Sequence, residues 1–337
     1  MKREPYVLLI TLALAGCGAA TNAEPRAVEA TNAEHAAPHA SATGKADGAV
    51  PAAAPAVERW VMLESSPGAT ELEAGATAAR ASEWTKAKAA LEPAIEKIRA
   101  SAPADATMAG EALLGRACLA LNDTACAERA FGSILAKWKE GVVPKIQAEG
   151  SDTESKPHVQ RALMAVGEAL FFEAEKKRAA TEPIRMPSYA GPSDKDSITR
   201  FIKDKVAPWA KTKRAAIDDA EAAYKKISAL EPSAPPYWVV HSTARVGTMK
   251  GHFVAEFRAA PIPGEWKKDG PVPGDTGLTW EDVRTSYYAA IDAASEPLKL
   301  EAKAAFETCQ QTSEKFGIAD DFSKSCDAWL TANYPAE

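Results

Sequence analysis

Apolar residues recur at steps of three and four positions through most of the chain, and this helical period constrains its fold more than any other feature. One clear stripe is formed by Ala216, Ile217, Ala220, Tyr224 and Ile227. Charged residues occupy much of the remaining surface of the same segment, as on an amphipathic helix. Ala, Glu and Lys are abundant, whereas alternating runs of β-branched residues are scarce. We therefore predict an all-α domain of packed antiparallel helices.

The expected helices are separated by short turns and by three long loops. Gly317, followed by Ile318, has the pattern of a helix C-cap, and Thr279 with Asp282 has that of an N-cap. The long loops cover residues 140–156, 181–193 and 260–279. The helices are expected at about 69–100, 106–120, 124–139, 157–179, 194–231, 236–258, 280–315 and 319–333.

The N-terminus has the pattern of an export signal. Lys2 and Arg3 precede an apolar run from Tyr6 to Leu14, which is shorter than the roughly 20 residues that span a bilayer. The sequence Leu14-Ala15-Gly16-Cys17 resembles the lipobox of bacterial lipoproteins. That resemblance implies a signal peptide over 1–16 and a lipid on Cys17. The alternative is an ordinary signal peptide followed by a cysteine that is there by chance.

An Ala-rich segment without large apolar residues follows the lipobox and extends to about residue 57. Such a composition buries too little apolar surface to fold, so residues 17–57 are expected to form a disordered tether. The tether has no polybasic cluster, so the lipid would be the only membrane contact. Gly18 is not the Asp that retains lipoproteins at the inner membrane of enteric bacteria. We therefore expect an exported envelope protein at the outer membrane, facing the periplasm.

The remaining chain, 58–337, is expected to form one helical-repeat domain, with a subdivision near 181–195. Four cysteines lie in it, and an even number in an oxidising compartment favours disulfides. Cys118 and Cys126 lie about one turn before and after a predicted helix–helix turn, and Cys309 and Cys326 flank Gly317 in the same way. This symmetry favours the pairs 118–126 and 309–326 over the crossed pairings. The alternative is four buried free thiols.

Two segments match the pattern of the tetratricopeptide repeat (TPR). The first match contains Leu114, Gly115, Ala127 and Phe131. The second contains Ala220, Tyr224, Pro232 and Trp238. In this pattern a small residue lets the neighbouring helix approach closely, and a large residue fills the gap between hairpins. The chain therefore resembles a degenerate TPR protein, which implies an α-solenoid-like stack of hairpins; the alternative is an unrelated helical bundle.

The C-terminal half also resembles a known group of proteins as a whole. Between Phe201 and Leu330 the segments FIKDKVAPW, RAAIDDAEAAYKKI, PPYWVV and FVAEFRAAPIP occur in succession. This succession resembles the TPR lipoproteins of myxobacteria and related lineages, some of which belong to envelope-spanning gliding machinery. The resemblance covers about half the chain and carries no catalytic motif, so it implies a scaffold.

Charge and motifs argue against several other functions. The 40 basic and 46 acidic residues give a net charge of -6 and are interspersed, which disfavours a nucleic-acid partner. No nucleotide-binding, hydrolase or zinc-protease motif is present. His35 and His39 lie in the tether, His158 stands alone, and His241 and His252 would lie about 16 Å apart along one helix. We therefore expect no metal, no cofactor and no enzymatic activity. The alternative is a hydrolase whose two acidic residues are distant in the sequence and come together only in the folded protein.

The loop 260–279 is the best candidate for an interaction site. It contains four prolines, four glycines and a central tryptophan, Trp266, and stiff loops of this length are often functional. The expected function is a non-catalytic scaffold that binds an envelope protein. The alternative is capture of a small ligand, a glycan or peptide, in a groove lined by Trp266, Trp238 and Tyr237. Trp266 could instead pack back onto the helices and cover an apolar patch.

Overall fold

The computed structural model describes residues 68–99, 102–148, 152–192, 194–273 and 277–335. The predicted signal peptide (1–16), Cys17 and the tether (17–57) lie outside these residues. The described part of the chain is all-α, as predicted, with one isolated β-bridge between Pro271 and Thr279. Its first six helices are α2 (Ala69–Arg80), α3 (Trp84–Ile98), α4 (Ala104–Ala120), α5 (Thr124–Lys139), α6 (Val142–Ala148) and α7 (Asp152–Thr181).

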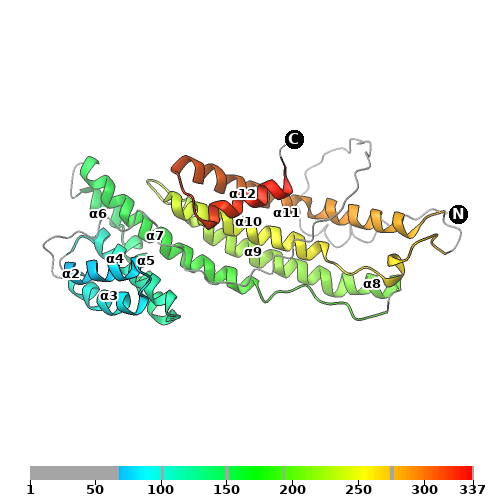
Figure 1. Cartoon of the computed structure of the whole chain (residues 1–337), viewed down its shortest axis with the longest axis horizontal. Helices are drawn as coiled ribbons and strands as arrows, with labels where there is room; N and C mark the ends of the chain where they lie inside the picture. The colour runs from blue at the N-terminus through cyan, green and yellow to red at the C-terminus, as the bar shows by residue number, and fades with distance from the viewer. Residues whose placement is uncertain (1–67, 100–101, 149–151, 193, 274–276, 336–337) are drawn as a thin grey trace.

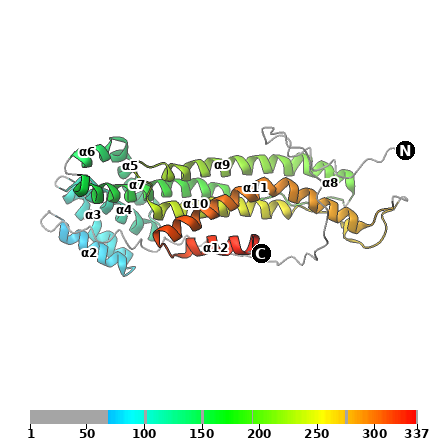
Figure 2. The ribbon, with the colours of Figure 1, turned by 90° about the horizontal axis from the view of Figure 1, so that it is seen from above.

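The remaining elements follow a loop after α7. They are α8 (Lys195–Phe201), the π-helical segment η1 (Ile202–Val206), α9 (Ala207–Ser228), α10 (Pro236–Arg258), the 3-10 turn η2 (Gly264–Lys267), α11 (Trp280–Phe316) and α12 (Asp321–Asn333). Figures 1 and 2 show α2–α6 gathered at one end, while α9, α10 and α11 run along the long axis.

Helix α7 joins the two parts of this arrangement. It packs against α4 and α5 at one end of the molecule and against α9 along the bundle. Helix α10 packs along α11, and α12 lies on both. The segment between α7 and α8 coincides with the subdivision that the sequence suggests near 181–195. Helix α7 nevertheless packs against helices that precede this segment and against helices that follow it.

Three expected elements differ from the structure. The helix predicted over 69–100 is broken at Ser82, which has a φ of 58°, and the amide of Glu83 bonds the carbonyl of Ala78 at 2.8 Å. The loop predicted over 140–156 contains α6 and the start of α7. The helix predicted over 194–231 widens to a π-helix before Pro208, whose ring has no amide hydrogen and would clash with the carbonyl one turn earlier.

Small residues bring helices close together, as the TPR pattern predicts for Gly115. A Cβ added at Gly115 of α4 would lie 2.6 Å from Cζ of Phe131 on α5. Phe131 is itself buried and packs on Phe172 of α7, with ring centroids 4.8 Å apart. The ring therefore fills the junction of α4, α5 and α7 and has little room to move.

We expect Gly115→Ala to destabilise the fold by about 1–2 kcal/mol, because the overpacking penalty exceeds the gain in helix propensity. The matched control is Gly132→Ala in α5, where an added Cβ meets nothing within 4 Å. That control should be neutral or stabilising by up to about 1 kcal/mol. Urea unfolding followed by circular dichroism measures both. Equal effects of the two substitutions would contradict the close approach at Gly115.

Candidate functional site

Trp266 lies in η2, and its ring packs against the first turns of α11. The centroid of its ring lies 5.5 Å from that of Tyr287, in an edge-to-face contact. The ring of Tyr287 lies in turn 5.4 Å from that of Tyr288. Trp266 is partly exposed, Tyr287 is buried and Tyr288 is 44% exposed. Trp266 therefore both packs back onto α11 and keeps part of its surface in solvent.

The backbone of this loop is fixed to α11. Arg284 donates from Nη1 to the carbonyl of Trp266 at 2.5 Å and to that of Lys268 at 2.7 Å. The amide of Val272 donates to the carbonyl of Leu278 at 2.9 Å. We call the set Trp266, Leu278, Tyr287 and Tyr288 the loop platform. Its ordered contacts mean that little entropy remains to be lost when a partner binds.

The start of α11 holds the other side of the loop. Thr279 is the N-cap of α11, as predicted, and it forms a capping box with Asp282, in which the amide of Thr279 donates to Oδ2 of Asp282 at 2.8 Å. The hydrogen bonds from Thr279 lower the pKa of the Asp282 carboxyl. Burial raises the pKa of the Tyr287 hydroxyl, with a smaller effect from Tyr288. Tyr287 therefore stays neutral, and its ring forms an apolar surface on which the ring of Trp266 packs.

Tyr237 and Trp238 lie in the first turn of α10 and are not part of the loop platform. Helix α10 has 23 residues, so its two ends are about 35 Å apart, and Trp266 follows the far end. Trp238 is only 3% exposed, and its ring packs against Phe171 of α7 with centroids 5.1 Å apart. The three predicted binding residues therefore do not line a common groove. Trp238 belongs to the core.

Tyr237 instead belongs to a set of polar and charged residues, most of them buried, which we call the central cluster: Arg116, Glu168, Tyr237, His241 and Asp320. Nε2 of His241 lies 2.7 Å from Oδ2 of Asp320, the N-cap of α12. The imidazole also lies against the rings of Tyr237 and Phe322, with centroids 4.1 and 4.0 Å away. One pair of residues thus connects the first half of α10 to the start of α12.

A buried ion pair forms the other side of the central cluster. Nε of Arg116 on α4 lies 2.6 Å from Oε1 of Glu168 on α7, and each residue is 5% exposed. Burial raises the pKa of the Glu168 carboxyl, although Arg116 opposes the effect. Burial also raises the pKa of the Tyr237 hydroxyl, and the charges of Asp320 and Glu168 add to this. The pKa of Tyr237 therefore responds to charges in both pairs, Arg116–Glu168 and His241–Asp320.

Sequence analysis did not find the central cluster. His241 follows the apolar run Trp238-Val239-Val240, which signals a buried histidine, but its partner is 79 positions away. His158 likewise has a partner that the sequence does not show. Its Nδ1 lies 2.8 Å from Oδ2 of the buried Asp105, which also accepts from Arg161.

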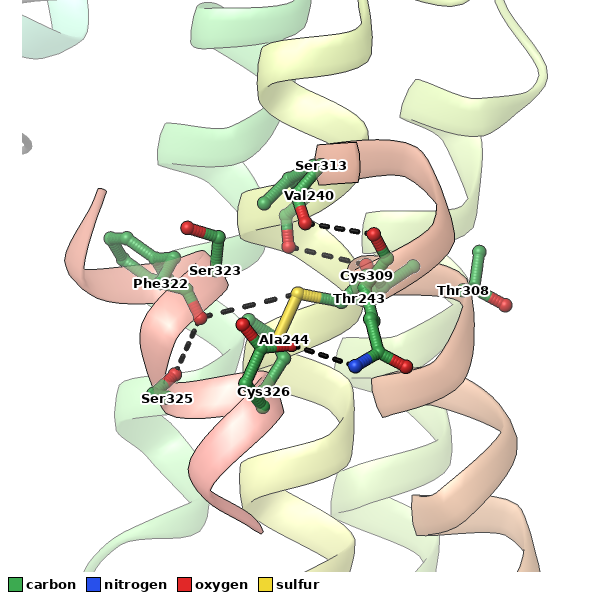
Figure 3. The surroundings of a disulfide bond; sticks show 12 residues. Val240, Thr243, Ala244, Thr308, Cys309, Ser313, Phe322, Ser323, Ser325 and Cys326 are labelled. Carbon is green, nitrogen blue, oxygen red and sulfur yellow. Dashed lines mark hydrogen bonds between the residues drawn. A yellow bond between two sulfur atoms is a disulfide. The ribbon is translucent and has the colours of Figure 1, made fainter. Parts of the chain in front are cut away.

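The structure pairs the cysteines as the turn symmetry predicts. Cys118 is bonded to Cys126 across the α4–α5 turn, and Cys309 to Cys326 across the α11–α12 turn, with Cα–Cα distances of 5.7 and 6.4 Å. Figure 3 shows the second bond beside Val240, Thr243 and Ala244 of α10. The bonded sulfur atoms of both pairs are buried, which fits a structural role.

One group of three candidate metal ligands lies close together in the described residues, and it consists of Cys118, Asp123 and Cys126. Its two sulfur atoms are bonded to each other, so neither is a thiolate. Asp123 is the N-cap of α5 and accepts from the amide of Cys126 at 3.1 Å and from Nζ of Lys88 at 2.7 Å. All three ligand groups therefore have a structural partner.

No protein-family model matches this chain, and neither a curated protein nor a solved structure is similar enough to it to count as a match. No helix in the described part of the chain combines the length and the apolar character that crossing a membrane requires.

Proposed function

We propose that this protein is a non-catalytic scaffold that is exported, tethered to the outer membrane through a lipid on Cys17, and binds a protein partner in the envelope. The observation that carries the proposal is the loop platform. It presents Tyr288 of α11 and part of the ring of Trp266, which lies on a loop that Arg284 holds against α11. TPR-like packing of the hairpins is part of the same proposal, and the contact between Gly115 and Phe131 supports it.

The loop platform has the properties of an interaction hot spot. Tryptophan and tyrosine dominate such sites because each buries a large area while few rotatable bonds are fixed. Leu278 and Tyr288 are exposed large side chains, and Tyr288 contacts Tyr287, on which the half-buried ring of Trp266 packs. The hydrogen bonds of Arg284 restrict the loop before any partner arrives. A partner therefore gains buried apolar area at a small entropic cost.

We expect Trp266→Ala to weaken partner binding by at least about tenfold, which corresponds to a hot-spot loss of more than 1 kcal/mol. The helices should keep their stability, because Trp266 packs at the rim of the molecule and is partly exposed. Cross-linking in cells, followed by purification and mass spectrometry, compares the native protein with the variant. Circular dichroism on heating measures stability in parallel.

The matched control is Phe316→Ala, which removes an exposed aromatic ring at the other end of α11. This control should retain the cross-linked partner. Partner recovery that is unchanged by Trp266→Ala, or a large loss of helical stability in that variant, would contradict the proposal. Efficient cross-linking without any enriched protein would favour the small-ligand alternative.

A further inference from the structure

The imidazole of His241 is enclosed on nearly every side, since the residue is only 1% exposed. Phe171 of α7 and Trp238 of α10 close the inner side, with ring centroids 5.9 and 5.4 Å away. The outer side is closed by two residues of the α12 start. Phe322 stacks on the imidazole, and Asp320 is hydrogen-bonded to it.

The outer side is also the side nearest to solvent. The side chain of Asp320 is 22% exposed and Phe322 is partly exposed, whereas Phe171 and Trp238 are core residues. Nδ1 of His241 has no hydrogen-bond partner in the described structure. A second proton on this ring would therefore be buried without an acceptor.

The start and the middle of α12 are held by different contacts. Gly317, in the turn after α11, has a φ of 64°, a conformation that glycine adopts without strain. Beyond the first turn, Cys326 is bonded to Cys309, and the ring of Trp329 stacks on Phe306 at 4.5 Å. The disulfide thus holds the middle of α12 while the His241–Asp320 contact holds its start.

We infer that the His241–Asp320 pair is a pH-sensitive lock, which opens when His241 takes up a proton and releases residues 317–323 from α10. Opening would uncover the imidazole of His241 and the face of Tyr237 that packs on it, two side chains that a ligand or partner could then reach. The disulfide would keep α12 attached throughout, so the opening is local and reversible.

The direction follows from proton binding. Burial lowers the pKa of His241 below its usual 6.5, and the hydrogen bond to Asp320 only partly opposes this. The closed state therefore holds fewer protons than the open state below about pH 6.5, so falling pH favours opening. Burial acts to raise the pKa of the Asp320 carboxyl, but the hydrogen bonds from His241 and Ser323 lower it below its usual value. Asp320 stays charged in this range and takes up a proton only in stronger acid.

The charged groups around the lock come from four helices. The groups that act on His241 or on the adjacent Tyr237 are Arg116 of α4, Glu168 and Glu175 of α7, Arg245 of α10 and Asp320 of α12. Arg245 lies one turn after His241, stacks on Phe322 at 4.9 Å and lowers the pKa of His241. A protonated His241 would therefore be repelled by a fixed positive charge on its own helix.

Hydrogen exchange measured by mass spectrometry tests the lock on the full chain. We expect protection of the peptide 317–326 to fall between about pH 7 and pH 5.5, after correction for intrinsic exchange, by up to about tenfold for each pH unit below 6.5. Peptides from α9 should not change. In His241→Gln this pH dependence should disappear. His252→Gln, a change at an exposed position of the same helix, should behave like the native protein.

A second variant keeps the test independent of whether His241→Gln folds. Asp320→Asn retains a good N-cap but removes the charge that raises the pKa of His241 in the closed state, so protection of 317–326 should fall more steeply below pH 6.5 than in the native protein. The imidazole resonance of His241 in nuclear magnetic resonance reports its pKa directly in the native protein. The inference fails if protection of 317–326 does not depend on pH, if all helices lose protection together, or if His241 titrates at or above its ordinary value.

Discussion

Arg116→Met should lower the free energy of unfolding by about 3–5 kcal/mol, the usual cost of removing one partner of a buried ion pair. Arg116 joins α4 to α7 through Glu168, with Nε and Oε1 2.6 Å apart, and both residues are almost completely buried. The variant leaves the Glu168 carboxylate in a site without a counter-charge. Urea unfolding followed by circular dichroism measures the loss against the native protein.

The double variant Arg116→Met/Glu168→Leu separates the ion pair from the packing at this site. An apolar pair of similar volume avoids the desolvation of both charges, so most of the lost stability should return.

The pH dependence of stability gives a second check on the single variant Arg116→Met. Burial already raises the pKa of Glu168, and without Arg116 the buried carboxyl should stay protonated to higher pH. The folded variant then binds more protons than the folded native protein above the raised native pKa of Glu168, so the deficit of Arg116→Met should grow as pH rises beyond that pKa.

Two results would contradict this account of the central cluster. If the double variant lost as much stability as the sum of the two single variants, the two side chains would act independently. If the deficit of Arg116→Met were the same at low and high pH, the unpaired charge on Glu168 would not be its cause.

Local sequence signals predicted those helices whose ends carry strong caps or breakers. The range 124–139 is reproduced by α5, whose N-cap Asp123 accepts from the amide of Cys126. The start of α11 at Trp280 follows the Thr279–Asp282 capping box, and its end precedes Gly317 in the left-handed conformation. At each of these positions the residue type satisfies the free groups of the helix end, so the signal is contained in a few neighbouring residues.

The structural features that the sequence did not predict, the break at Ser82 and helix α6, lacked such local signals. Ser82 adopts a positive φ with neither glycine nor proline beside it, so no residue type marks the break between α2 and α3. Helix α6 is only seven residues long, so its period is too short to recognise. Its apolar residues Val142, Val143 and Ile146 are nevertheless buried in the core shared with α5 and α7.

The candidate sites show the same division between local and tertiary information. Proline, glycine and tryptophan in one loop drew attention to Trp266, but its anchor Arg284 comes from a different element. Trp238 has a residue type that suits binding and packing equally well. Its burial depends on Gly167 of α7, where an added Cβ would lie 2.7 Å from Cδ1 of Trp238. The pairs Arg116–Glu168 and His241–Asp320 depend wholly on tertiary packing, and charged residue types alone do not reveal them.

Replacing the second disulfide, with Cys309→Ala/Cys326→Ala, should lower the free energy of unfolding by about 3 kcal/mol, since the bond closes a loop of 17 residues. The matched variant Cys118→Ala/Cys126→Ala opens a loop of eight residues and should cost about 2.5 kcal/mol. Urea unfolding measures both. Thiol titration of the denatured, non-reduced native protein should detect none of these four cysteines.

The two variants should differ more in where the structure loosens than in how much stability they lose. Helix α5 remains packed against α4 and α7 without its disulfide, whereas α12 has its major helix contacts with α10 and α11. Hydrogen exchange should therefore increase along the whole of α12 in Cys309→Ala/Cys326→Ala at neutral pH. If α12 kept its protection there, the packing of Phe322, Trp329 and Leu330 would suffice to hold it, and the disulfide would act mainly on the unfolded chain.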